Sequence, residues 1–195
     1  MNRVRGQLGA MVVAIGLMWT AASAARADDY QTDPVHSFVI FRVHHFGAGY
    51  VWGNFIGPKG AITLDGGDAT KDSFDLTVNA ESLDTRNGNR DKDLKGPDFF
   101  DTKQFPTLTF KSTSVKKTGD TTLEVTGDLT AHGVTKSITV EMDLTGTGQG
   151  MKGETRTGFE TTFTINRSDY GMTYDPPPAI GDEVRITVAI EAIKQ

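Results

Sequence analysis

The chain has 195 residues with no cysteine, and its 25 acidic side chains outnumber its 20 basic ones, for a formal charge of −5. The lack of cysteine excludes a disulfide scaffold and any metal or redox site built on thiolates. A hydrophobic content of 37% and a charged content of 23% exclude a disordered or collagen-like chain, and the length allows one or two domains.

Residues 1–27 have the pattern of a cleaved secretory signal peptide. Two arginines precede the apolar run 8–19, which is too short to span a bilayer, and a small-residue cleavage site ends at Ala27. A retained N-terminal anchor is the alternative. Without this segment and its three arginines, the chain carries 17 basic and 25 acidic side chains, a formal charge of −8. We therefore expect an exported, periplasmic protein that begins at Asp28 and binds no nucleic acid.

From Tyr30 onward, apolar and polar residues alternate, as in half-buried antiparallel strands. The alternating segments, separated by turn residues, are 35–46, 51–55, 62–64, 74–80, 108–115, 123–129, 138–144, 159–165 and 184–190. If 51–55 and 62–64 are two halves of one bent strand, the chain has eight strands. We expect them to form a single domain over residues 28–195.

The length of these strands favours a closed barrel over a sandwich. Runs of about 10 to 13 residues extend about 33 to 43 Å, which is tall for a small sandwich. An outer-membrane barrel would turn its apolar face outward, but one tryptophan and four tyrosines after residue 27 are too few for two aromatic girdles. The sequence therefore predicts an all-β, eight-stranded antiparallel barrel whose apolar face lines the lumen.

The alternation stops between residues 83 and 106. Within this connection, residues 90–95 followed by a Gly-Pro pair predict one or two helical turns. A connection of more than about 20 residues inside a compact β domain is usually functional or a lid. Phe99 and Phe100 follow the predicted turns, and adjacent residues of an extended segment do not both point inward easily. We expect core packing from this pair, with one of them a candidate lid residue.

Motifs in a fixed order occur along the whole mature chain. They are Val35-His36-Ser37, His45-x-Gly47, Trp52-Gly53-x-Phe55, Ser82-Leu83-Asp84-Thr85, Arg90-Asp91-x-x-Leu94, Asp98-Phe99-Phe100-Asp101, Phe105-Pro106, Gly127-Asp128-Leu129-Thr130 and Asn166-Arg167-x-Asp169-Tyr170-Gly171. This series resembles the YceI family. The resemblance implies a barrel of lipocalin-like shape, exported by bacteria, whose apolar lumen holds an extended polyisoprenoid or other lipid-like chain, with no known catalytic role.

The leading hypothesis is a lipid-binding protein that holds a long apolar chain, polyisoprenoid or quinone-like, for transport, storage or sequestration. The alternative is a periplasmic stress or interaction protein with a filled core and no tightly bound ligand. The family often has histidine where this chain has Asp93 and arginine where it has Lys95, so no headgroup contact is assigned at Asp93. Contact with the membrane or with a membrane redox protein is left open, as is the oligomeric state.

The candidate ligand site is the lumen lining. On the first long strand one face is apolar, and the other carries Arg42, whose charge would be costly inside. The candidate lining residues are Val39, Phe41, Val43, His45, Val51, Gly53, Phe55, Phe99, Phe100, Phe110 and Phe163. His45, at the end of its row, either hydrogen-bonds a ligand's polar head or satisfies local backbone groups.

Gly53 and Gly127 interrupt apolar rows that otherwise carry bulky side chains. Each glycine either leaves room for a ligand or permits a bulge or bend that closes the barrel, and bends are the more frequent reason.

The sequence carries no set of residues that favours catalysis. It lacks a Gly-x-Ser-x-Gly elbow, a Walker loop and a His-Glu-x-x-His motif. His44 and His45 point to opposite faces of one strand, so they are poor joint metal ligands. We therefore expect no enzymatic activity, no metal and no cofactor.

Overall fold

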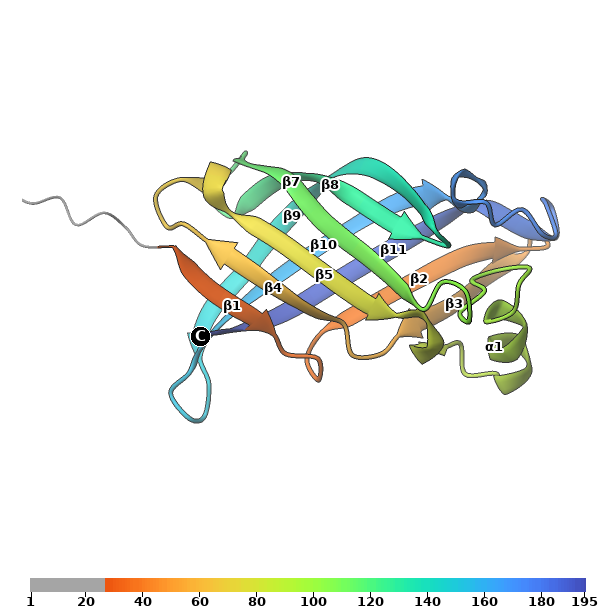
Figure 1. Ribbon diagram of the computed structural model, residues 1–195, viewed down its shortest axis with the longest axis horizontal. Helices are drawn as coiled ribbons and strands as arrows, with labels where there is room; N and C mark the ends of the chain where they lie inside the picture. The colour runs from red at the N-terminus through yellow and green to blue at the C-terminus, as the bar shows by residue number, and fades with distance from the viewer. Residues whose placement is uncertain (1–26) are drawn as a thin grey trace, which may run out of the picture.

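The computed structural model describes residues 27–195, so the predicted signal peptide lies outside the described residues except for Ala27. The described chain forms one antiparallel sheet of eleven strand segments (Figure 1). These are β1 (Asp28–Thr32), β2 (Phe38–His45), β3 (Gly49–Phe55), β4 (Lys59–Leu64), β5 (Ser73–Asn79), β6 (Leu83–Asp84), β7 (Thr107–Lys117), β8 (Thr122–Ala131), β9 (Val134–Gln149), β10 (Thr155–Asn166) and β11 (Ile180–Lys194). Helix α1 (Gly88–Leu94) and three short 3₁₀ helices (Ala69–Lys71, Ala80–Ser82 and Arg167–Tyr170) complete it.

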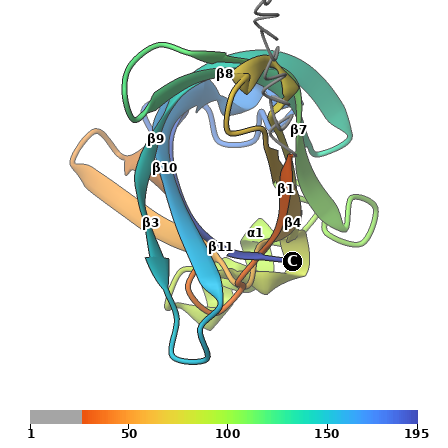
Figure 2. The same cartoon turned by 90° about the vertical axis from the view of Figure 1, so that its left-hand side faces the viewer.

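The sheet closes into a barrel because β1 pairs with β4 on one edge and with β11 on the other. The ring therefore runs β1-β4-β5-β7-β8-β9-β10-β11, which confirms the predicted eight-stranded antiparallel barrel (Figure 2). The remaining segments extend this ring toward one end. β2 follows β1 along β11, β3 pairs with β2, and β6 pairs with the last two residues of β3.

Three details of the predicted strands are wrong. The first long strand begins at Phe38 and not at residue 35, because Asp33–Ser37 form a turn in which the Asp33 side chain accepts a hydrogen bond from the Val35 amide at 3.0 Å. The sequence pattern also missed β1, in which Tyr30 is the only buried residue. β9 and β11, with 16 and 15 residues, are longer than expected because both continue past their apolar segments.

The two ends of the barrel differ. One end is filled by a cluster of buried side chains, the closed-end cluster, which includes Tyr30, Ile62, Phe74, Val125 and Phe159. In it the Phe74 and Phe159 rings meet edge to face, with centroids 5.2 Å apart. Helix α1 lies at the opposite end, far from the C-terminus (Figure 1). None of the helices described within residues 27–195 has the length and hydrophobicity that a transmembrane helix needs.

Helix α1 confirms the helical turns predicted in the long connection. The Asn87 side chain accepts a hydrogen bond from the Arg90 amide and caps the first turn. The Lys95 and Gly96 amides donate to the Asp91 and Asp93 carbonyls, and Pro97 follows directly. Asp91 then ties the helix to the barrel, since its carboxylate accepts hydrogen bonds from the amide and hydroxyl of Thr85.

Candidate functional site

A cavity of about 790 Å³ lies inside the barrel and extends toward the α1 end. Its volume falls within the range of about 300 to 1,000 Å³ typical of ligand pockets. Val140, Met142 and Val188 belong to the cavity wall and also pack in or against the closed-end cluster, so this cluster forms the cavity floor. The site is therefore a deep pocket with a packed floor.

Ten of the eleven predicted lining residues lie on the cavity wall. They are Val39, Phe41, Val43, His45, Val51, Phe55, Phe99, Phe100, Phe110 and Phe163. Six of them lie on β2 and β3, where every second residue faces the interior. Phe110 and Phe163 face the cavity from β7 and β10, and Phe99 and Phe100 belong to the segment after α1. The wall also includes residues that sequence reasoning did not single out, among them Leu108, Ile138, Ile165, Ile186 and Val188.

Gly53 is the predicted lining residue that lies outside the wall. It sits opposite Phe41 in the β2–β3 ladder, and a Cβ atom at Gly53 would overlap the Phe41 ring and lie 2.9 Å from the Thr85 methyl group. Gly127 lies opposite Ser112 in the β7–β8 ladder, and a Cβ there would lie 2.5 Å from the Phe110 ring and 2.6 Å from the Lys111 carbonyl oxygen. Each glycine thus makes room for an aromatic side chain of the barrel wall.

Three segments form the mouth of the cavity: the β2–β3 hairpin, the stretch that follows α1, and the loop 172–179 before β11. Phe100 points inward, with its ring centroid 5.3 Å from that of Phe55 and 6.3 Å from that of Phe41. Phe99 instead meets Tyr174 edge to face across the mouth, with centroids 5.5 Å apart. The adjacent phenylalanines therefore divide between the wall and the rim.

Arg167 holds the loop 172–179 and the start of β11 in place. It is 94% buried, and its guanidinium spans the two ends of the loop. The guanidinium donates to the carbonyls of Met172 (2.7 Å), Tyr174 (2.7 Å), Asp175 (2.8 Å), Gly181 (3.0 Å) and Ile180 (3.3 Å). Burial lowers the pKa of Arg167, while the nearby carboxylates of Asp182 and Asp175 oppose that change. Because its donors are used by the loop, Arg167 has a positioning role at the mouth.

His45 lies at the mouth end of its strand and is exposed. Its ring meets the Phe46 ring edge to face, with centroids 4.3 Å apart. Within residues 27–195 the imidazole makes no hydrogen bond, so it does not satisfy the local backbone there. Its nitrogens are free to contact a ligand at the mouth.

The charged side chains that line the cavity lie at its mouth. Lys92, Asp93, Asp98 and Asp175 border it, and no ion pair joins any of them to another described residue. Arg90 is held by Thr85, to whose hydroxyl and carbonyl it donates at 2.8 and 2.7 Å. The pocket thus combines an apolar wall with a polar entrance.

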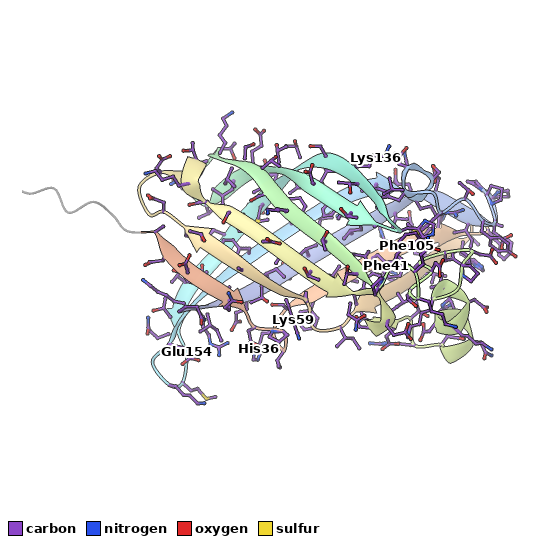
Figure 3. The ribbon with its side chains drawn as sticks, viewed as in Figure 1. His36, Phe41, Lys59, Phe105, Lys136 and Glu154 are labelled. Atoms are coloured by element: carbon purple, nitrogen blue, oxygen red, sulfur yellow. The ribbon has the colours of Figure 1, made fainter. Side chains whose placement is uncertain are left out.

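A separate cluster of ionisable groups lies outside the lumen. The ligand atoms of Asp33, His36 and Glu191 are within 4.8 Å of one another, a spacing compatible with a metal ion. The Arg156 guanidinium already occupies this cluster, since it donates to Asp33 at 2.8 Å and also to Glu191. Hydrogen bonds from His36 and Arg156 hold the pKa of Asp33 well below its ordinary value. His36 and Glu154, which also binds Arg156, lie on the same side of the barrel (Figure 3). The cluster is an ion-pair network that ties the turn after β1 to β10 and β11.

Sequence comparison finds a family model and known proteins that are similar to this chain over most of its length. The model of the YceI-like domain family matches residues 30–192. Protein YceI of Escherichia coli O17:K52:H18 is 41% identical over 181 residues, which cover 92% of this chain and 93% of the relative.

Two solved structures have the same fold. Burkholderia cenocepacia BcnA superposes with a TM-score of 0.75 at 23% identity, covering 82% of this chain and 98% of BcnA. A domain from Saccharophagus degradans, described as polyisoprenoid-binding and implicated in plant cell wall breakdown, superposes with a TM-score of 0.65 at 16% identity. This superposition covers 85% of this chain and 98% of that domain.

Proposed function

Because the chain belongs to the YceI-like family, we propose that it is an exported lipid-binding protein that holds a long apolar chain, polyisoprenoid or quinone-like, in the barrel lumen. The observation that carries this proposal is the cavity of about 790 Å³, which has an apolar wall and a packed floor. The polyisoprenoid-binding description of the Saccharophagus degradans domain supports the ligand class. The signal pattern of residues 1–27 supports export and a periplasmic location.

Burial of hydrocarbon is the proposed source of affinity. Each methylene moved from water to the lumen contributes about 0.8 kcal/mol before ordering costs. If a methylene takes the volume share of a water molecule, about 30 Å³, the 790 Å³ cavity holds roughly 25 carbon atoms, or about five isoprene units. A longer chain would extend through the mouth.

The mouth would orient such a ligand. A polar head left at the entrance meets the His45 imidazole and the Lys92 ammonium, while the apolar chain follows the wall to the floor. The Phe99–Tyr174 pair lies across this path and would have to separate when a ligand enters. We assign Phe99 the role of lid residue and Phe100 that of wall residue.

The cavity argues against the alternative of a core filled by the protein's own side chains. The described side chains leave a volume of ligand size at the centre of the barrel, whereas a filled barrel leaves few voids larger than a water molecule. No catalytic step is part of the proposal.

Blocking the lumen tests this function. Ile186 faces the cavity from β11, and Ile186→Trp would place an indole where about three methylenes of the ligand would lie. At about 0.8 kcal/mol each, their loss corresponds to about fiftyfold weaker binding. We expect the lipid that is extracted into organic solvent per mole of purified protein to fall accordingly, as measured by mass spectrometry.

The matched control is Thr187→Trp on the outer face of the same strand. Thr187 lies next to Ile186 and contacts Thr162 at 2.9 Å between hydroxyl oxygens. This variant adds the same indole without entering the lumen, so it should retain the wild-type lipid content. Equal lipid content in both variants, with both folded by circular dichroism, would contradict a ligand in the lumen.

A further inference from the structure

An exposed aromatic face lies beside the cavity mouth. It consists of Phe46, Tyr50 and Trp52 on the β2–β3 hairpin, whose side chains are 65%, 52% and 55% exposed. Tyr50 and Trp52 point away from the lumen, because Val51 and Phe55 of the same strand point into it. Large contiguous apolar groups on a surface mark interaction sites for proteins or membranes.

The local backbone keeps these rings in solvent. β3 pairs with β6 only at Asn54 and Phe55, so the outer edge of Gly49–Gly53 has no partner strand among the described residues. Phe46 sits at the hairpin tip with φ +52°, followed by Gly47 with φ +66°. A bulky residue is rarely found in this left-handed region, so the tip keeps an exposed phenylalanine at a cost in backbone energy.

Arg42 lies within this face and has no partner that balances its charge. Its guanidinium carbon is 4.2 Å from the centre of the Tyr50 ring and 5.5 Å from that of Trp52. Within residues 27–195 the Arg42 side chain makes no hydrogen bond and no ion pair, and its Nε is buried without a partner. A guanidinium that stacks on aromatic rings keeps its Nη donors available, so those of Arg42 can bind a ligand that covers this face.

A second arginine faces the same way. Arg185 of β11 is paired with Arg42 in the strand ladder and is exposed. Like charges directly opposite each other in a ladder destabilise a sheet. The acid nearest along the outer face of β11, Glu183, forms no ion pair with either arginine. An anion bound between the two guanidinium groups would remove their repulsion.

We propose that this face docks onto an anionic phospholipid bilayer, with Arg42 and Arg185 bound to lipid phosphates and the three rings at headgroup depth. A guanidinium fork matches phosphate oxygens, and tryptophan and tyrosine side chains favour the membrane interface. Because the chain from Asp28 carries a formal charge of −8, the attraction must be local to this face. Docking would bring the cavity mouth to the bilayer. A role of this docking in lipid transfer rests on the proposed function, whereas binding of the face to vesicles does not.

Vesicle binding by residues 28–195, which contain every strand of the closed barrel, tests this proposal. Trp52 is the sole tryptophan of that chain, so its fluorescence reports on the face directly. With vesicles of phosphatidylethanolamine and phosphatidylglycerol, we expect co-flotation and a shift of Trp52 emission to shorter wavelength. Two cations near a membrane surface contribute enough that Arg42→Gln/Arg185→Gln should weaken binding about thirtyfold.

The matched control is Lys116→Gln/Lys117→Gln, which removes two positive charges from the far end of β7 and should leave binding unchanged. Failure of the wild type to bind, or an equal loss in the control, would overturn docking. So would a Trp52 emission shift that grows with protein concentration without vesicles, because a second copy would then cover the face. Lipid extracted from the same preparations separates membrane docking from lipid binding in the lumen. Protein that contains lipid but does not bind vesicles overturns docking alone. Protein that binds vesicles but contains no lipid supports docking and contradicts the proposed function.

Discussion

Replacing Arg167 with methionine should lower the free energy of unfolding by about 3 to 5 kcal/mol. The buried guanidinium donates to five carbonyls of the segment 172–181, and methionine fills the space without donating to any of them. Unpaired buried carbonyls each cost about 1 to 3 kcal/mol, and water reaching those near the mouth reduces the sum. Urea unfolding followed by circular dichroism measures the difference.

Arg167→Lys is the informative second variant. A lysine keeps the charge but offers a compact ammonium in place of the planar fork, so it should recover only part of the lost stability. Amide hydrogen exchange should show faster exchange within residues 172–181 in the methionine variant before global unfolding. Wild-type stability in Arg167→Met would contradict the positioning role and, with it, our account of how the mouth is built.

Gly53→Leu should destabilise the protein by about 3 kcal/mol, through overpacking of the barrel wall. Its first side-chain atom would already overlap the Phe41 ring, which is 92% buried and held against Phe55 at a centroid distance of 5.7 Å. This loss should be present in lipid-free protein, because the clash is with the protein's own side chain. Thermal unfolding of delipidated protein measures it.

Two companion variants isolate the cause of this effect. Gly49→Leu lies on the same strand, where a Cβ meets no atom within 4 Å, and should change stability little. Phe41→Ala combined with Gly53→Leu should be less destabilised than the sum of the single variants by about 1 to 3 kcal/mol, since the clashing ring is gone. Additive losses would contradict the clash with the Phe41 ring, and a Gly53→Leu effect confined to lipid affinity would show that Gly53 makes room for the ligand instead.

The barrel was predictable from the sequence because it depends on a local property, the period-two alternation of apolar residues. That pattern located nine of the eleven strand segments and placed residues such as Val43 and Val51 on the cavity wall. The Gly-Pro pair after Lys95 located the end of α1 for an equally local reason. β1 was missed because its five residues contain a single buried side chain, Tyr30, too few for any periodicity.

The role of Gly53 depends on a property that no local pattern carries. Its contact with Phe41 follows from the register of β2 against β3, which places a phenylalanine opposite a glycine. Alternation fixes which face a residue takes but not which side chain lies across from it. The two roles inferred for Gly53 from the sequence were space for a ligand and a bend in the strand. Neither inference included the Phe41 ring, which is the group that Gly53 contacts in the structure.

Arg167 was visible in the sequence only as part of a motif. Its five acceptors are main-chain carbonyls of the loop 172–179 and of the first two residues of β11, and a main-chain acceptor does not require any particular residue type. Tyr174 was missed for a related reason, since its contact with Phe99 joins two loops that are distant in the chain. The order of the motif Asn166-Arg167-x-Asp169-Tyr170-Gly171 was the available signal that this region matters.

Native mass spectrometry of the protein purified from its own host is the most direct test of a lipid held in the lumen. The account predicts a complex of one protein chain with one long-chain lipid, whose mass is released intact into organic solvent. The Ile186→Trp variant, purified in the same way, should lack that mass. Wild-type protein that is folded and free of any extractable lipid would contradict the account.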